Sequence, residues 1–187
     1  GPNGAGKTTL VKSLVGDLPL LGGDRMAHPD LQIGYFAQHT VESLHAGMTP
    51  MDHFREISPD GVNQSFRDFL GKWNFPGDRA FESIDGFSGG ERKRNELLQL
   101  TQLNPRVALL DEIDSGLDVD GVRAVVELVQ RMRAQGTAFI VVSHYLQMIE
   151  SLQPDQVLRL DQGRIAETGG LELARSIAET GFTRATA

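Results

Sequence analysis

The stretch GPNGAGKTTLVKSLV, residues 1–15, decides the fold, because its start fits the pattern G-x-x-x-x-G-K-[ST]. Glycines let backbone amides curl around phosphate oxygens, and a helix that follows points its positive end at the same anion. The lysine reaches the β- and γ-phosphates, and the hydroxyl after it ligates Mg²⁺. We therefore predict a nucleotide-binding loop made of Gly1, Pro2, Asn3, Gly4, Ala5, Gly6, Lys7, Thr8 and Thr9, with Thr8 also on the metal.

A second stretch, VALLDE at residues 107–112, is an apolar strand that ends in two carboxylates. A carboxylate at the carboxyl end of a strand beside a phosphate loop can hold Mg²⁺ through water. A second carboxylate can polarise the water that attacks the phosphate. We predict the first role for Asp111 and the second for Glu112.

Composition narrows the class of protein. The 187 residues suffice for one domain, and the apolar and charged fractions of 40% and 23% are typical of soluble globular proteins. No apolar run reaches the ~18 residues of a membrane helix, and no signal peptide is evident. The absence of cysteine excludes disulfides and thiolate ligands, and a net charge of −7 argues against charge-driven nucleic-acid binding. We expect a cytoplasmic protein.

Apolar strands alternate with amphipathic helices along the chain, which is typical of an α/β fold with a mainly parallel sheet. Strands are expected at 31–36, 106–110 and 137–142, a hairpin at 157–160 and 164–166, and helices at 7–15, 89–103, 118–134 and 171–179. Residues 42–105 are predicted to form a helical lobe inserted into a single domain, 1–187. Because Gly1 already lies inside the phosphate loop, we expect the strand that feeds the loop to be missing from this sequence.

Further motifs follow in order along the sequence. The stretch FSGGE, residues 87–91, resembles the signature loop of ABC ATPases. Gln38 resembles the Q-loop glutamine of that family, Ser115-Gly116-Leu117-Asp118 resembles its D-loop, and His144 resembles its switch histidine. Together with the phosphate loop and the acidic strand end, these motifs identify the chain as similar to a P-loop NTPase of the ABC type.

The resemblance implies a mechanism in which two such domains, as a homodimer or heterodimer, close head to tail over two ATP molecules. Lys7 and Thr8 would then hold phosphate and Mg²⁺, Asp111 would hold Mg²⁺ through water, and Glu112 would act as the general base. The residues implied as catalytic are Lys7, Gln38, Glu112 and His144, with Gln38 also at the metal. Ser88, Gly89 and Gly90 would contact the γ-phosphate of the ATP held by the partner chain. In this family an N-terminal strand lobe carries an aromatic residue that stacks on adenine, and we expect that lobe to be missing from this sequence.

Two subfamilies are represented in the chain. Residues 1 to about 90 resemble the ABC-F proteins, which are ribosome-associated ATPases. From Ser88 onward, FSGGERKRNELLQ and LLDEIDSGLDVD resemble the ATPase subunit of the Suf iron–sulfur cluster assembly system. The resemblance implies the ATPase subunit of a soluble assembly machine with a scaffold-protein partner. A ribosome-bound translation factor and the ATPase of a membrane permease are the alternatives, and a natural divergent member and a recombined sequence both stay open.

Overall fold

The computed structural model describes residues 4–37, 47–57, 67–68, 70–71, 75, 77–88, 91–92, 95, 97, 100–101, 104–114 and 117–181. A three-stranded sheet has the order β1 (Ile33–Ala37), β2 (Val107–Asp111), β3 (Ala138–Val142), and both pairings are parallel. A separate antiparallel pair joins β4 (Val157–Asp161) to β5 (Arg164–Gly169). The predicted α/β architecture with a mainly parallel sheet is confirmed.

The register of the sheet determines which motifs meet. Ala37 pairs with Asp111, and Asp111 pairs with Val142, so the three strands end in one row. The amide of Glu112 donates to the Val142 carbonyl at 2.9 Å and extends this row by one residue. The segments that follow β2 and β3 therefore leave the sheet at the same carboxyl edge, where ligands bind in open α/β sheets.

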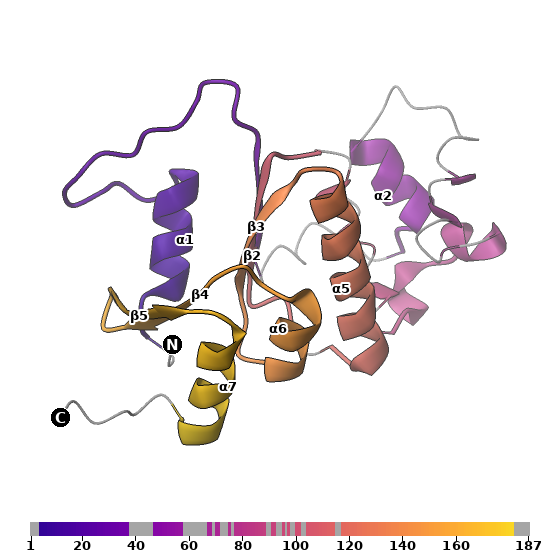
Figure 1. Ribbon diagram of the computed structural model, residues 1–187. Coiled ribbons are helices and arrows are strands. Elements are labelled where there is room, and N and C mark those ends of the chain that lie inside the picture. The colour runs from indigo at the N-terminus through magenta and orange to yellow at the C-terminus, as the bar shows by residue number, and fades with distance from the viewer. Residues whose placement is uncertain are drawn as a thin grey trace.

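Strand β2 is the buried centre of the sheet. Figure 1 shows α1 (Lys7–Val15) on one side of the sheet and α5 (Val119–Ala134) on the other. Burial on both faces explains why β2 is an uninterrupted apolar run rather than an alternating one. The inner side of α5 is buried as its helical spacing predicts, at Val122, Val125, Val126, Val129 and Met132.

Helix α1 is covered on a different side from the one its spacing suggests. The pattern groups Leu10, Leu14 and Val15, yet Leu10 and Leu14 are 38% and 39% exposed and the buried residue is Val11. Among the described elements α1 makes its main contacts with β2, which covers only one side of the helix. Strand β3 shows the same effect, since its described partner is β2 alone and Ile140 is 42% exposed.

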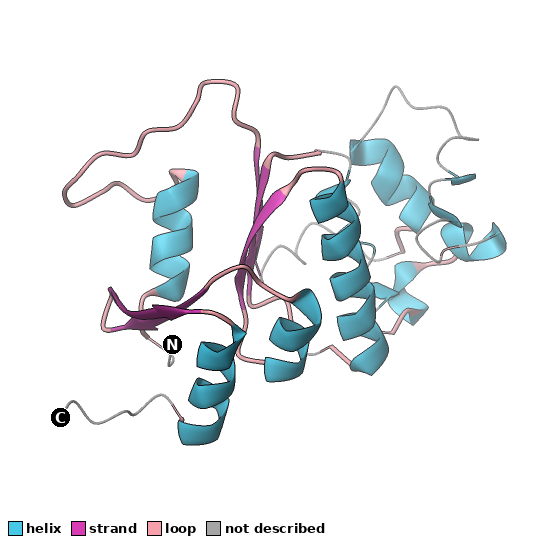
Figure 2. Ribbon diagram, viewed as in Figure 1, coloured by secondary structure: helices cyan, strands magenta, loops and turns pink. Residues whose placement is uncertain are grey.

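Two helices follow the sheet. Helix α6 (Leu146–Leu152) packs against α5 and α7 (Leu171–Thr180), and Figure 2 shows all three as one group of helices. Arg133 donates to the Leu152 carbonyl at 2.8 Å, which satisfies a carbonyl at the end of α6. Arg175 of α7 pairs with Glu150 of α6 at 2.7 Å. Within the described ranges, no helix is long and apolar enough to cross a membrane.

The helical lobe contains α2 (Pro50–Ile57), two short 3₁₀ helices, Gly77–Phe81 and Ile84–Gly86, and helical residues between 91 and 101. The amide of Asp52 donates to the Thr49 hydroxyl at 3.1 Å, so Thr49 caps α2, as the Thr-Pro start predicts. Gly34 of β1 is in close contact with Leu100 of the lobe. A Cβ at position 34 would come within 2.7 Å of Leu100 Cδ2, so a larger residue does not fit there without a shift. The extent of the lobe, 42–105, and the single domain 1–187 stay predictions.

We expect the stability of the lobe to fall in mild acid because of His53. This side chain is buried on α2, and burial lowers its pKa, while the Asn95 side chain and the charge of Glu56 act in the opposite direction. Because the folded state resists protonation, unfolding becomes easier as pH drops below the ordinary histidine pKa of ~6.5. The melting temperature of His53→Leu should therefore depend less steeply on pH, between pH 7.5 and about 5, than that of the wild type.

The exposed His28 provides the matched control for that measurement. His28→Asn should keep the wild-type slope of melting temperature against pH, because the His28 side chain is 74% exposed and lies outside the lobe core. Equal slopes for wild type and His53→Leu would show that His53 does not link pH to folding.

Candidate functional site

The phosphate loop has the backbone that a phosphate cradle requires. Gly4 and Gly6 have φ of 79° and 91°, in the left-handed region where glycine is favoured. Gly6 precedes α1, and no side chain caps that helix. The uncapped N-terminus of a helix attracts anions, so α1 points its positive end at whatever the loop holds.

Lys7 and Glu112 form the central contact of the site. Lys7 Nζ lies 3.2 Å from Glu112 Oε1, and the two side chains are 14% and 29% exposed. Residues 105 positions apart are thus brought together, as the motif pattern predicts. Glu112 has a φ of 53°, which is uncommon for a residue with a side chain and is typical of functional turns.

Asp111 is buried next to this pair, with 3% of its surface exposed. Burial raises the pKa of its carboxyl, the hydrogen bond with Thr8 opposes that effect, and the charge of Glu112 adds to it. Its Oδ1 is buried and lacks a hydrogen-bond partner in the described structure. A buried carboxylate oxygen without a donor beside a threonine hydroxyl is an arrangement that a hard cation satisfies.

These residues fit Mg²⁺. No group of three or more His, Asp or Glu side chains suited to a metal is found in the described ranges. Mg²⁺ does not need such a group at a nucleotide site, because it is held by one or two protein ligands together with phosphates and water. Thr8 and Asp111 are the described side chains that would hold it.

The segment after β3, residues 143–145, makes a contact that the motif pattern did not predict. The Ser143 hydroxyl donates to Asp114 Oδ2 at 2.7 Å and accepts from the Tyr145 amide at 3.0 Å. The turn after β2 and the turn after β3 are thereby joined at the carboxyl edge. His144 stands between Ser143 and Tyr145 in the sequence, and its side chain is exposed. In the described part of the chain, no hydrogen bond or ion pair joins His144 to Lys7 or Glu112.

The tip of the β4–β5 hairpin supports the phosphate loop. The Gly163 amide donates to the Ala5 carbonyl at 2.9 Å, and a Cβ on Gly6 would lie 3.3 Å from the Gly163 Cα. Gln162 and Gly163 have φ of 45° and 75°, the conformation of a tight hairpin turn. Sequence spacing predicts the hairpin, but it gives no indication that the hairpin meets the loop.

Ser88, the residue that matches the serine of the family's signature loop, belongs to the helical lobe. Ser88 is exposed on the lobe, and among the described residues no bond links it to Lys7 or Thr8. Figure 1 shows the lobe helix α2 well away from α1, with the sheet and α5 between them. Among the described residues, therefore, no bond places Ser88 at the phosphate loop of its own chain.

Several predicted residues lie outside the described residues: Gly1, Pro2, Asn3, Gln38, Gly89, Gly90, Ser115 and Gly116. Their roles stay predictions. Asp118 of the predicted D-loop is described, and its carboxylate accepts from the Gly121 amide at 2.7 Å as the N-cap of α5.

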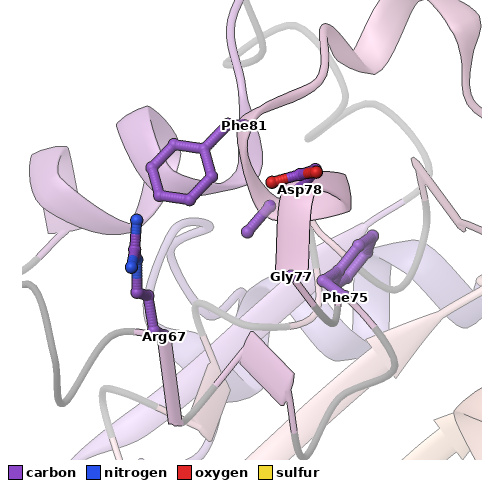
Figure 3. A pocket seen from close by; sticks show the side chains of 6 residues that line it. Arg67, Phe75, Gly77, Asp78 and Phe81 are labelled. Atoms are coloured by element: carbon purple, nitrogen blue, oxygen red, sulfur yellow. The ribbon is translucent and has the colours of Figure 1, made fainter.

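A small cavity of about 110 Å³ lies in the lobe and is separate from the site at Lys7. Figure 3 shows Arg67 beside the Phe81 ring on one side of it, with Asp78 and Phe75 on the other. The Arg67 guanidinium carbon is 4.9 Å from the Phe81 ring centre. Ligand pockets usually measure about 300–1,000 Å³, so this cavity is too small for a nucleotide.

Comparisons with known proteins show which family the chain belongs to. The ABC transporter family model matches residues 1–115, more than half of the chain. Vegetative protein 296 of Bacillus subtilis is 33% identical over 208 residues, covering 97% of this chain and 79% of that protein. The Probable ATP-dependent transporter SufC of Escherichia coli is 31% identical and covers 97% and 84%. The Probable ATP-binding protein YheS of Escherichia coli is 37% identical over 92% of this chain, but the match spans only 26% of YheS.

Among solved structures, cbiO1 of Clostridium perfringens, part of the ABC transporter complex cbiONQ, superposes with a TM-score of 0.75. It covers 96% of this chain and 78% of that chain at 21% identity, which supports the fold alone. The chain belongs to the ABC ATPase family and is an ATP-binding domain of that class. The relatives include SufC and YheS, so both resemblances seen in the sequence are confirmed.

Proposed function

We propose that the chain hydrolyses ATP to ADP and phosphate with Mg²⁺, as one half of a head-to-tail dimer. The observation that carries this proposal is the contact between Lys7 and Glu112 at 3.2 Å, with Asp111 and Thr8 beside it. Phosphoryl transfer needs mainly positioning and charge stabilisation, and this arrangement supplies a cation, a base and a metal-binding carboxylate at one point.

Each side chain has a distinct task in this mechanism. The phosphates of ATP attract Lys7, which releases Glu112 from their ion pair. Glu112 then orients the attacking water and accepts its proton. Thr8 and Asp111 would hold Mg²⁺, which would supply positive charge against the charge that develops on the phosphate oxygens. Gln38 and His144 sense the γ-phosphate, as their motif positions imply.

A dimer is proposed because Ser88 is not bonded to the phosphate loop of its own chain in the described structure. A second chain in head-to-tail orientation brings its Ser88, Gly89 and Gly90 to the γ-phosphate. We therefore expect turnover per chain to rise with protein concentration until the dimer is saturated. Steady-state phosphate release, measured over a hundredfold dilution series, tests this. A turnover per chain that is constant across the series, with the protein monomeric by light scattering, would contradict it.

For the biological role we propose the energising ATPase of a cytoplasmic assembly machine, such as one for iron–sulfur clusters. SufC supports this because the match covers 97% of this chain and 84% of SufC. YheS supports a ribosome-associated role as the second candidate, with a somewhat higher identity over a much smaller share of that protein. An ATPase that serves a membrane permease is the third, supported by the family itself.

Affinity purification of the tagged chain from its own cells separates the three roles. The assembly role requires that scaffold proteins co-purify in a ratio near one to one. Ribosomal proteins in their place would favour the second role, and an integral membrane permease would favour the third.

A further inference from the structure

Arg79 is held at the centre of a small charged cluster in the lobe. Its Nε and a terminal nitrogen donate to Glu91 Oε1 at 3.0 and 2.7 Å, and it also donates to Glu82 Oε2. Its guanidinium carbon lies 4.3 Å from the centre of the Phe87 ring. Phe87 is buried and stacks on Phe75 with ring centres 5.6 Å apart, so the aromatic surface beneath Arg79 is part of the lobe core.

Glu91 connects this cluster to Ser88. The Ser88 amide donates to Glu91 Oε2 at 2.9 Å, and the Glu91 amide donates to the Ser88 hydroxyl oxygen at 3.3 Å. This reciprocal pair is a capping box, which fixes the residue before a helix relative to the first turn. One oxygen of Glu91 thus holds Ser88 while the other is held by Arg79.

We propose that Arg79 and Glu91 are positioning residues for Ser88: they hold the signature serine in the orientation in which it reaches the γ-phosphate bound by a second chain. This inference rests on the proposed function and deepens it. Neither residue touches the nucleotide in this proposal. They act through Ser88, and their effect is expected only at the nucleotide of the opposite chain.

Physical reasons favour a positioning role over a merely structural one. The Arg79 guanidinium packs on the buried ring of Phe87, which restricts the positions that Arg79 can adopt. Arg79 in turn restricts the positions of the Glu91 carboxylate. A charged carboxylate that accepts hydrogen bonds at both oxygens has few alternative rotamers, which keeps the capping geometry constant. Misplacement of a reacting group by about 1 Å can lower a rate by about 100-fold.

The test compares Arg79→Gln, Glu91→Ala and Glu91→Gln with the wild type. We expect kcat to fall about 10- to 100-fold in Arg79→Gln and Glu91→Ala, with KM for ATP changed less than about twofold, because the nucleotide binds to the loop of its own chain. Glu91→Gln should recover part of the loss, since glutamine also closes a capping box. Glu82→Gln is the matched control: it removes the other acid on Arg79, makes no contact with Ser88, and should keep wild-type kcat.

Mixing variants shows where the defect acts. Glu112→Gln inactivates the nucleotide of its own chain and leaves Ser88 intact, whereas Arg79→Gln impairs only the signature side. A 1:1 mixture forms one functional site in half of its dimers, so activity should return to about a quarter of the wild-type value if the two sites act independently. Wild-type kcat in Arg79→Gln, or a mixture no more active than its components, would overturn the proposal. Constant turnover per chain from a wild type that is monomeric by light scattering would instead contradict the dimer itself, before any variant is compared.

Discussion

Replacement of Glu112 by glutamine will remove ATP turnover and leave ATP binding in place. Glutamine keeps the shape of the side chain but cannot accept the proton of the attacking water, and the loss of a general base lowers a rate by roughly 100-fold or more. ATP affinity should stay equal or rise slightly, because Lys7 no longer pairs with a carboxylate 3.2 Å away and is available to the phosphates. With ATP present, the variant should accumulate as a closed dimer.

Two measurements follow this variant: phosphate release under saturating ATP, and the molar mass in solution with and without ATP. Glu179→Gln, which changes an exposed acid on α7, is the control and should behave as the wild type. Unchanged turnover in Glu112→Gln would remove Glu112 from the role of base. Loss of ATP binding along with turnover would show that Glu112 supports the loop instead.

Replacement of Asp111 by asparagine should have opposite effects on stability and on binding. Burial raises the pKa of this carboxyl, so its ionisation destabilises the folded state. The loss of stability grows as pH rises from the ordinary aspartate pKa to the raised one and is constant above it. Asparagine removes that charge, and the melting temperature without ligand should rise by roughly 2–4 °C for each kcal/mol recovered. The stabilisation that Mg²⁺ and ATP give together should disappear, because the carboxylate that holds the cation is gone.

Thermal melts of both proteins, with ATP plus Mg²⁺ and with ATP plus EDTA, measure these two effects side by side. Asp114→Asn is the useful comparison, since Asp114 is a second buried acid in the same turn whose partner is Ser143 rather than Thr8. Asp114→Asn should keep the response to Mg²⁺. A lower melting temperature for ligand-free Asp111→Asn would indicate that Asp111 is a structural acid and not a cation site.

The strands and the site at Lys7 could be predicted from sequence because local signals determine them. Strand β2 is an uninterrupted apolar run closed by two acids, and the loop before α1 needs glycine at positions 4 and 6, where φ is positive. Parallel pairing then brings the strand ends to one edge whatever the loop lengths. The motif order together with this pairing predicts that Lys7, Asp111 and Glu112 lie close together.

Other contacts could not be predicted, because they depend on packing between distant segments. Nothing local in Gly163 indicates that its amide meets the Ala5 carbonyl, and nothing in Ser143 indicates Asp114 as its partner. The exposed side of α1 was also unpredictable, since helical spacing reveals an apolar stripe but not what covers it. The contact of Arg79 with Glu91 could not be predicted either, because it depends on how the lobe folds back.

The central claim is that the phosphate loop, Asp111 and Glu112 surround one nucleotide and its metal. A crystal structure of the chain with a non-hydrolysable ATP analogue and Mn²⁺ in place of Mg²⁺ tests it most directly. We expect one anomalous peak within ligand distance of Thr8, beside Asp111, with the γ-phosphate between Lys7 and Glu112. A nucleotide bound elsewhere, or a Mn²⁺ peak remote from both Thr8 and Asp111, would contradict the claim.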